Sequence, residues 1–127
     1  MTNHLSKVGT PLGISESYWE AECRRDIDGL MAHYHADGSY EGPDGHRTGY
    51  DAIRAGYEEH FRLFPELEVE IVQEFPRGDS SAIEFDAVMV DPEGTRYRVR
   101  GVNIVEVRDG KFVSMRSYED PPAGTGQ

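Results

Sequence analysis

The sequence predicts an α+β domain, a cone in which N-terminal helices pack in the concave face of a curved antiparallel β-sheet. Three observations support this prediction. Apolar residues recur at helical spacing in the first half of the chain, whereas from Leu67 onward they alternate at strand spacing. The turn signals "PRGDS", "DPEGT" and "RDGK" divide this second half into four strands. Helices followed by an antiparallel sheet form two layers, with the helices on one face.

Length and composition limit the kind of protein. The 127 residues fit one domain, expected over residues 14–120, with a flexible N-terminal segment (1–13) and a flexible tail (121–127). A cytoplasmic location is expected because the sequence shows neither a run of roughly 20 apolar residues nor a secretory signal. Cys23 is the single cysteine, which excludes an internal disulfide. The formal net charge of −11 excludes nucleic acid and anionic membranes as expected partners.

Three helices are expected before the four strands. The first is expected to have Ser15 or Ser17 as its N-cap and to continue through "SYWEAECRRD", with its acids on the outer face. The second, "DIDGLMAHYH", is expected to end at Gly38. A short strand, "SYEG", and a loop, "PDGHRTG", precede the third helix, "YDAIRAGYEEHFRLFP". Its apolar stripe consists of Ile53, Tyr57, Phe61 and Phe64.

The turn "DPEGT" sets the register of the second and third strands. Proline and glycine stand where a type I turn with a glycine bulge needs them, so Asp91 should pair with Thr95 and Asp86 should face Arg100. This register makes one face of the sheet apolar and pairs acids with arginines on the other. Asn103 is the one polar side chain in the apolar row, so it either ties down the backbone or faces a ligand.

The opposite, charged face of the sheet is expected to carry Glu84 and Asp86 as surface or interface residues. Valine and isoleucine side chains lie between its charges. This mixed face predicts a homodimer that forms through the sheet, and the apolar residues concerned are Val88, Val90, Val102 and Ile104.

Three motifs, "DIDGLMAHYHADGSYEGP", "HRTGYDAIRAGYEEHF" and "RGVNIVEVRDGKFVSMRSYED", carry a resemblance through their order and spacing. The chain resembles the NTF2-like superfamily over roughly Ser15 to Asp120, and within it ketosteroid isomerase and the SnoaL-like cyclases. The resemblance implies a cofactor-free enzyme that isomerises or cyclises an apolar carbonyl compound by proton transfer. The same fold also includes epoxide hydrolases, dehydratases and non-catalytic ligand-binding or dimerisation modules, which remain alternatives.

The similarity to ketosteroid isomerase implies roles for four residues. The tyrosine of the isomerase's oxyanion hole falls on Tyr18, and the tyrosines that support it fall on Tyr34 and Tyr57. The second oxyanion donor falls on Asn103, whose amide can donate a hydrogen bond at any pH. Tyr18 and Asn103 would together stabilise an enolate oxygen.

The catalytic base is the point at which the resemblance leaves alternatives open. Gly42 occupies the base position and has no side chain to accept a proton, which argues against steroid isomerase activity itself. Glu41 is adjacent, although strand alternation turns it to the opposite face. Asp120 matches an acid on the closing strands of the hydrolase and cyclase relatives. Strand parity, by contrast, puts Glu119 on the inner face.

An aromatic and apolar pocket with inward-facing hydroxyl groups is expected to bind a hydrophobic small molecule that carries a carbonyl or phenol. An ordinary hydrophobic core is the alternative. His60 is expected to be a partly exposed helix residue, and a place at the pocket mouth is the alternative. The histidines lack the spacing of a metal site, so no metal is expected. The expected substrate-binding residues are Tyr34, Tyr57, Phe61, Phe85, Met89, Tyr97 and Met115.

Overall fold

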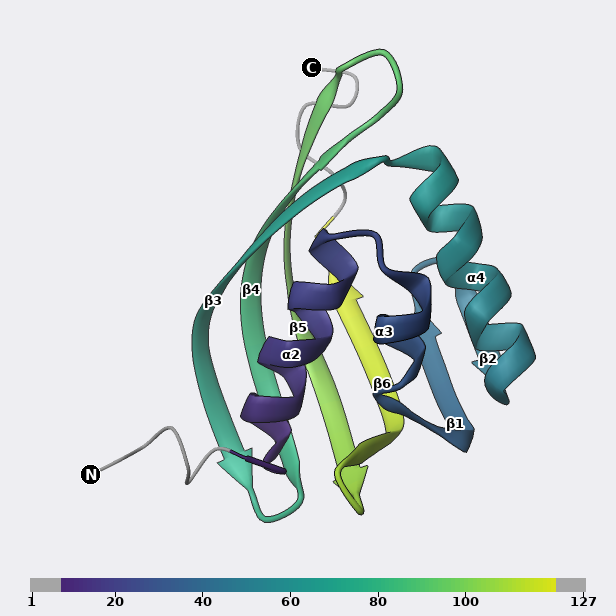
Figure 1. Cartoon of the computed structure of the whole chain (residues 1–127). Helices are drawn as coiled ribbons and strands as arrows, with labels where there is room; N and C mark the ends of the chain where they lie inside the picture. Colours follow the sequence, from purple (N-terminus) through teal and green to yellow (C-terminus); the bar gives the residue numbers. More distant parts are fainter. Residues whose placement is uncertain (1–7, 121–127) are drawn as a thin grey trace.

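The computed structural model describes residues 8–120, so the tail expected over 121–127 and most of the expected N-terminal segment lie outside the described residues. Within these residues, three helices lie on one side of a curved six-stranded sheet, and the placement of helices on one face is as the sequence predicted (Figure 1). The helices are α2 (Pro11–Cys23), α3 (Ile27–Met31) and α4 (Tyr50–Leu63). The strands are β1 (Tyr34–Gly42), β2 (Gly45–Thr48), β3 (Glu66–Arg77), β4 (Ser80–Val90), β5 (Arg96–Arg108) and β6 (Lys111–Glu119).

The strand order is β2-β1-β6-β5-β4-β3, and every neighbouring pair is antiparallel except β1 with β6. The register predicted from "DPEGT" is confirmed, since Asp86 pairs with Arg100 and the Asp91 amide donates to the Thr95 carbonyl at 3.0 Å. The next hairpin pairs Gly101 with Glu119. Alternate residues of β4, β5 and β6 therefore face the helices.

Helix α2 begins earlier than expected. Its N-cap is Thr10, whose hydroxyl oxygen accepts a hydrogen bond from the Gly13 amide at 3.1 Å. Pro11 follows at the first helical position, where its missing N–H leaves no helical hydrogen bond unmade. Ser15, the expected N-cap, lies inside the helix with 2% of its surface exposed. The predicted helix start is therefore wrong, and the helix extends into the segment expected to be irregular.

The second helix is shorter than expected. Helix α3 ends at Met31, and the predicted end at Gly38 is wrong because the chain has entered β1 at Tyr34. The Phe112 amide donates to the His33 carbonyl at 2.8 Å, so the hydrogen bonding of the sheet begins directly after the helix. Backbone pairing with a distant strand here outweighs the helical spacing of the apolar residues.

The predicted loop "PDGHRTG" contains strand β2, which the sequence analysis did not identify. Residues 45–48 pair with β1 in a hairpin that joins Gly42 to Gly45 across Pro43 and Asp44. No apolar alternation marks β2, because it is an edge strand whose residues are almost all exposed.

The core lies between the helices and the inner face of the sheet. Phe112, Leu30, Met31, Ile53 and Ile83 are at most 1% exposed. No helix within residues 8–120 is long and apolar enough to cross a membrane. The packing is incomplete on the side of α4, where a cavity remains.

Candidate functional site

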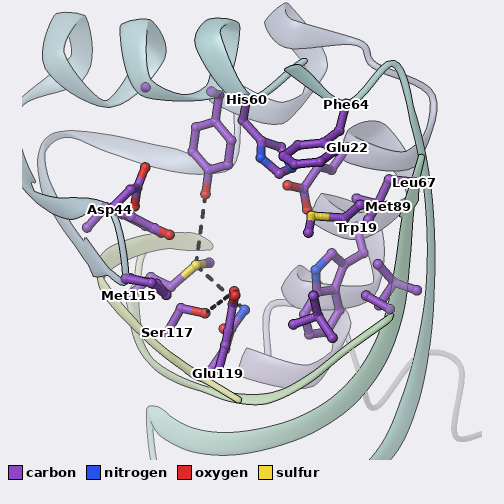
Figure 2. Close-up of a pocket in the computed structure, with 18 of the residues that line it drawn as sticks. Trp19, Glu22, Asp44, His60, Phe64, Leu67, Met89, Met115, Ser117 and Glu119 are labelled. Atoms are coloured by element: carbon purple, nitrogen blue, oxygen red, sulfur yellow. Dashed lines mark hydrogen bonds between the residues drawn. The ribbon is translucent and has the colours of Figure 1, made fainter. Parts of the chain in front are cut away.

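A cavity of about 430 Å³ lies between the helices and the inner face of the sheet (Figure 2). Residues of α2 and α4 line it from one side, and residues of β1 and β3 to β6 line it from the other. Trp19, Phe64, Leu67 and Met89 provide apolar walls. Polar side chains enter between them, so the space is a lined pocket rather than a packing defect.

Three buried tyrosines form a hydrogen-bonded chain at the cavity. The hydroxyl oxygens of Tyr18 and Tyr57 are 2.5 Å apart, and those of Tyr34 and Tyr57 are 2.8 Å apart. Tyr18 and Tyr57 line the cavity, whereas Tyr34 is not among its lining residues. Burial raises the pKa of each phenol above its ordinary value, so all three keep their protons at neutral pH. These hydrogen bonds between tyrosines hold the Tyr18 hydroxyl at the cavity wall.

Asn103 enters the cavity from β5 with 4% of its surface exposed. Its Nδ2 contacts the Met115 sulfur at 3.7 Å, and its Oδ1 is buried without a hydrogen-bond partner among the described residues. A thioether sulfur is a weak acceptor, and an unpaired buried amide oxygen costs about 1–3 kcal/mol. The Asn103 amide is therefore poised to bind a polar group of a ligand.

Of the three acids considered as the catalytic base, Glu41, Glu119 and Asp120, it is Glu119 that lines the cavity. It lies on β6 at the rim, where the side chain remains open to solvent, and the Ser117 hydroxyl donates to its Oε2 at 3.2 Å. Partial burial raises the pKa of the Glu119 carboxyl, and the hydrogen bond from Ser117 opposes that rise. Asp120 instead lies outside the cavity, with its carboxylate 3.5 Å from the Arg100 guanidinium. Strand alternation turns the neighbouring acids to opposite faces of the sheet.

In the hairpin of β1 and β2, Gly42 has no room for a side chain that could act as a base. Glu41 is exposed and does not line the cavity. A Cβ atom added at Gly42 would overlap with the hydroxyl group of Tyr40, which is on the same side of the strand. The Tyr40 ring thus fills the space that a side chain at Gly42 would need.

Glu22 is a cavity residue that the sequence analysis missed, since the acids of the first helix were expected on the outer face. The side chain is 7% exposed and lines the cavity from α2. Burial raises the pKa of its carboxyl to about 7, Arg25 opposes the rise, and Glu119 adds to it. The spacing of four residues from Tyr18 was the signal that could have placed Glu22 on the inner face.

His60 and Trp19 also line the cavity. His60 is a partly exposed residue of α4, as expected, and it also has the place at the pocket that was the alternative. Burial lowers the pKa of His60 to about 4, and the positive charge of Arg25 lowers it further. The imidazole is therefore neutral at physiological pH. Asp44 and Arg47, which also line the cavity, form an ion pair of 3.0 Å.

The expected substrate-binding residues divide into two groups. Those that line the cavity are Tyr57, Phe85, Met89 and Met115. Tyr34, Phe61 and Tyr97 do not line the cavity. Tyr34 bonds to Tyr57, the Phe61 ring lies 4.5 Å from the Arg25 guanidinium carbon, and the Tyr97 hydroxyl donates to Asp91 at 3.0 Å near the β4–β5 turn. Within residues 8–120, no group of three or more His, Cys, Asp or Glu could hold a metal ion.

Comparison with known proteins gives one family match. Residues 15–115 match the family model described as "SnoaL-like domain". A search among curated proteins finds no significant match.

Solved structures with the same fold include enzymes and ligand complexes. A putative isomerase from Bacillus subtilis has a TM-score of 0.80 at 18% identity, over 94% of this chain and 91% of that chain. A Mycobacterium tuberculosis protein, solved in complex with estradiol-17beta-hemisuccinate, has a TM-score of 0.74 at 26% identity, over 84% and 90% of the two chains. TerC, co-crystallised with polyporic acid, has a TM-score of 0.76 at 18% identity, over 86% and 90%.

Proposed function

The chain belongs to the family of SnoaL-like domains, and from this premise we propose that it is a cofactor-free enzyme that moves a proton on an apolar carbonyl compound. One observation carries the proposal: a single cavity contains the Tyr18 hydroxyl, the Asn103 amide, whose Nδ2 donates only to the weakly accepting Met115 sulfur, and the Glu119 carboxyl. Hydrogen-bond donors and an acid in one apolar pocket are the groups that enolate chemistry needs.

The proposed reaction begins with the substrate carbonyl oxygen between Tyr18 and Asn103. The Glu119 carboxylate removes a proton from the carbon next to the carbonyl, and the electron pair of that C–H bond forms the enolate. The Tyr18 hydroxyl and the Asn103 amide donate hydrogen bonds to the negative oxygen, while Tyr57 positions Tyr18. Return of the proton to another carbon gives an isomer, and attack of the enolate carbon on a second carbonyl of the same molecule gives a ring.

The nature of the ligand is supported by both the cavity and the similar structures. Estradiol-17beta-hemisuccinate and polyporic acid, bound in two of these structures, are small molecules with ring systems. Here Trp19, Phe85 and Tyr57 provide aromatic wall. We therefore propose an apolar ring compound as the substrate class.

The test follows deuterium incorporation at the α-carbon of β-tetralone, a bicyclic ketone, in deuterium oxide by NMR. Tyr18→Phe and Asn103→Ala are each expected to lower the enzymatic exchange rate about tenfold or more, because each removes an oxyanion donor. Tyr50→Phe is the matched control, since Tyr50 is 38% exposed and does not line the cavity. Wild-type rates in both cavity variants would remove the oxyanion assignment. Absence of exchange by the wild type would leave the protein a ligand-binding module.

We also propose a homodimer that forms through the outer face of the sheet. Exposed Phe75 and Tyr118 add to the apolar side chains between the charges of this face. The face also carries both acids and arginines, with Asp86 opposite Arg100, so a two-fold interface could bring acids of one protomer to arginines of the other. Light scattering at micromolar concentration should give a mass of roughly twice the 14.3 kDa of one chain. Ile104→Asp should reduce the measured mass to that of a single chain, because it places a charge in the interface. A wild-type monomer would contradict this proposal.

A further inference from the structure

We propose that Glu22 is a catalytic proton donor of this site and acts together with Glu119 as an acid and base pair on one neutral ketone. This inference rests on the proposed function, because it names the group that delivers a proton to the carbonyl oxygen while Glu119 removes one from carbon. Neither the family model nor the similar structures assign a role to Glu22.

The position of Glu22 supports the inference. The residue lies on α2 four positions after Tyr18, so the two side chains share one face of the helix. Both line the cavity. In Figure 2 the Glu22 carboxyl points into the cavity beside His60 and Met89, while Glu119 enters from the sheet on the other side. A ligand between them would meet Glu22 and the Tyr18 hydroxyl together.

Arg25 does not neutralise Glu22 through an ion pair. Its two terminal nitrogens donate to backbone carbonyls, one to Glu22 at 3.0 Å and the other to Phe64 at 2.7 Å. The guanidinium group also lies over the Phe61 ring. Among residues 8–120, no cation forms an ion pair with the Glu22 carboxyl. A buried acid without such a partner holds its proton more tightly than an exposed one.

The charges around Glu22 act in opposite directions, and burial is what raises the pKa of its carboxyl: Arg25 lowers this pKa, and Glu119 raises it by a smaller amount. The phenols and the thiol that face it have raised pKa values and are neutral at pH 7, so Arg25 and Glu119 are its charged neighbours. Partial burial raises the pKa of Glu119 as well, but its side chain is exposed and accepts a hydrogen bond from Ser117, which opposes that rise and favours the ionised form. Because the two carboxyl groups have different environments, Glu22 serves as the acid and Glu119 as the base. The groups that interact with Glu22 are Tyr18, Cys23, Arg25, Tyr34, Tyr40, Tyr57 and Glu119.

The pair closes a catalytic cycle without a co-reactant. The Glu119 carboxylate takes the α-proton, the C–H electron pair becomes the carbon–carbon double bond, and the carbonyl π electrons take the proton from the Glu22 hydroxyl. The product of this step is a neutral enol. The enol O–H then returns its proton to Glu22, and Glu119 returns its proton to carbon. Both carboxyls end in their starting states, and Tyr18 and Asn103 hold the oxygen throughout.

The decisive experiment measures kcat/KM for α-deuterium exchange on β-tetralone from about pH 5 to pH 9. In the wild type kcat/KM should fall above about pH 7 as Glu22 loses its proton. Glu22→Gln should lower kcat/KM about a hundredfold at pH 6 and abolish this alkaline decline. Glu20→Gln, an exposed change on the same helix, should keep the wild-type rate and profile.

The outcomes separate the inference from the proposed function. If Glu22→Gln shows the wild-type rate and alkaline decline, Glu22 is not the donor, although the proposed function stands. If the wild type itself shows no exchange, both fall.

A second measurement does not depend on a substrate. Carboxyl NMR of glutamate-labelled protein should show Glu22 titrating near pH 7 and at lower pH in Glu119→Gln, because the substitution removes the negative charge across the cavity. An unchanged Glu22 titration in Glu119→Gln would overturn the pairing. Gln has the shape of a protonated Glu, and far-ultraviolet circular dichroism verifies that each variant is folded.

Discussion

Glu22→Gln is expected to stabilise the folded protein above pH 7 by roughly 3 kcal/mol relative to its effect near pH 4. Burial raises the pKa of Glu22 from 4.5 in an exposed chain to about 7 in the fold. The folded state therefore holds this proton over a pH range in which the unfolded chain has released it. The stability that comes from the protonated carboxyl is fully present below pH 4.5 and is lost as the pH rises through 7. Gln cannot ionise, so the variant avoids this loss.

Urea unfolding followed by Trp19 fluorescence tests this expectation at several pH values between about 4 and 8. The quantity compared is the difference in the free energy of unfolding between variant and wild type. This difference should grow with pH in Glu22→Gln and stay constant in Glu20→Gln, since Glu20 is exposed on the same helix. A difference that is the same at both ends of the range would show that Glu22 is not buried as an acid.

Glu119→Gln is expected to lower the rate of α-proton exchange about a hundredfold or more, since an amide cannot act as a general base. Glu119 lines the cavity, whereas Asp120 pairs with Arg100 outside it. Asp120→Asn should therefore leave the rate within about twofold of the wild type. The two variants are a matched pair, because the acids are neighbours in the sequence but only Glu119 faces the cavity.

Deuterium exchange on β-tetralone, with kcat and KM measured separately, distinguishes a base from a binding group. Loss of the base should lower kcat, whereas loss of a binding contact alone should raise KM. A loss confined to Asp120→Asn would transfer the role of base to Asp120 and contradict the assignment of Glu119. Thermal unfolding of both variants verifies that the comparison is made between folded proteins.

Much of the sheet could be predicted because its determinants are local. The four strands from β3 to β6 agree with the predicted segments, and the register of β4 and β5 followed from the turn "DPEGT". Between β5 and β6, Arg108 pairs with Lys111 across a two-residue turn, and a register shift between Glu106 and Val107 is also needed to pair Gly101 with Glu119. A tight turn fixes which residues face each other, and alternation then assigns every side chain to a face. The predicted inner face includes Asn103 and Glu119, and both line the cavity.

The errors arose where distant contacts decide the structure. Helix α3 stops at Met31 because β1 pairs with β6, which follows it by some eighty residues, and β2 exists only as the partner of β1. Asp120 and Tyr97 have residue types that suit a site, yet Asp120 follows the end of β6 and Tyr97 lies near the start of β5, and each bonds to a group outside the cavity. Phe61 lies on the predicted helical stripe, but the cavity does not extend to it.

The sequence by itself thus determined the layers of the fold, the strand register and the side of the sheet on which the site lies, because turn residues and apolar periodicity act over a few residues. Only the tertiary structure decided which acids share the cavity. Glu22 looks like an ordinary surface acid of an N-terminal helix, and its burial depends on α2 packing across the sheet. The environment of a carboxyl group, and hence its pKa, is made by elements that are distant in the chain, so its chemistry appears only after folding.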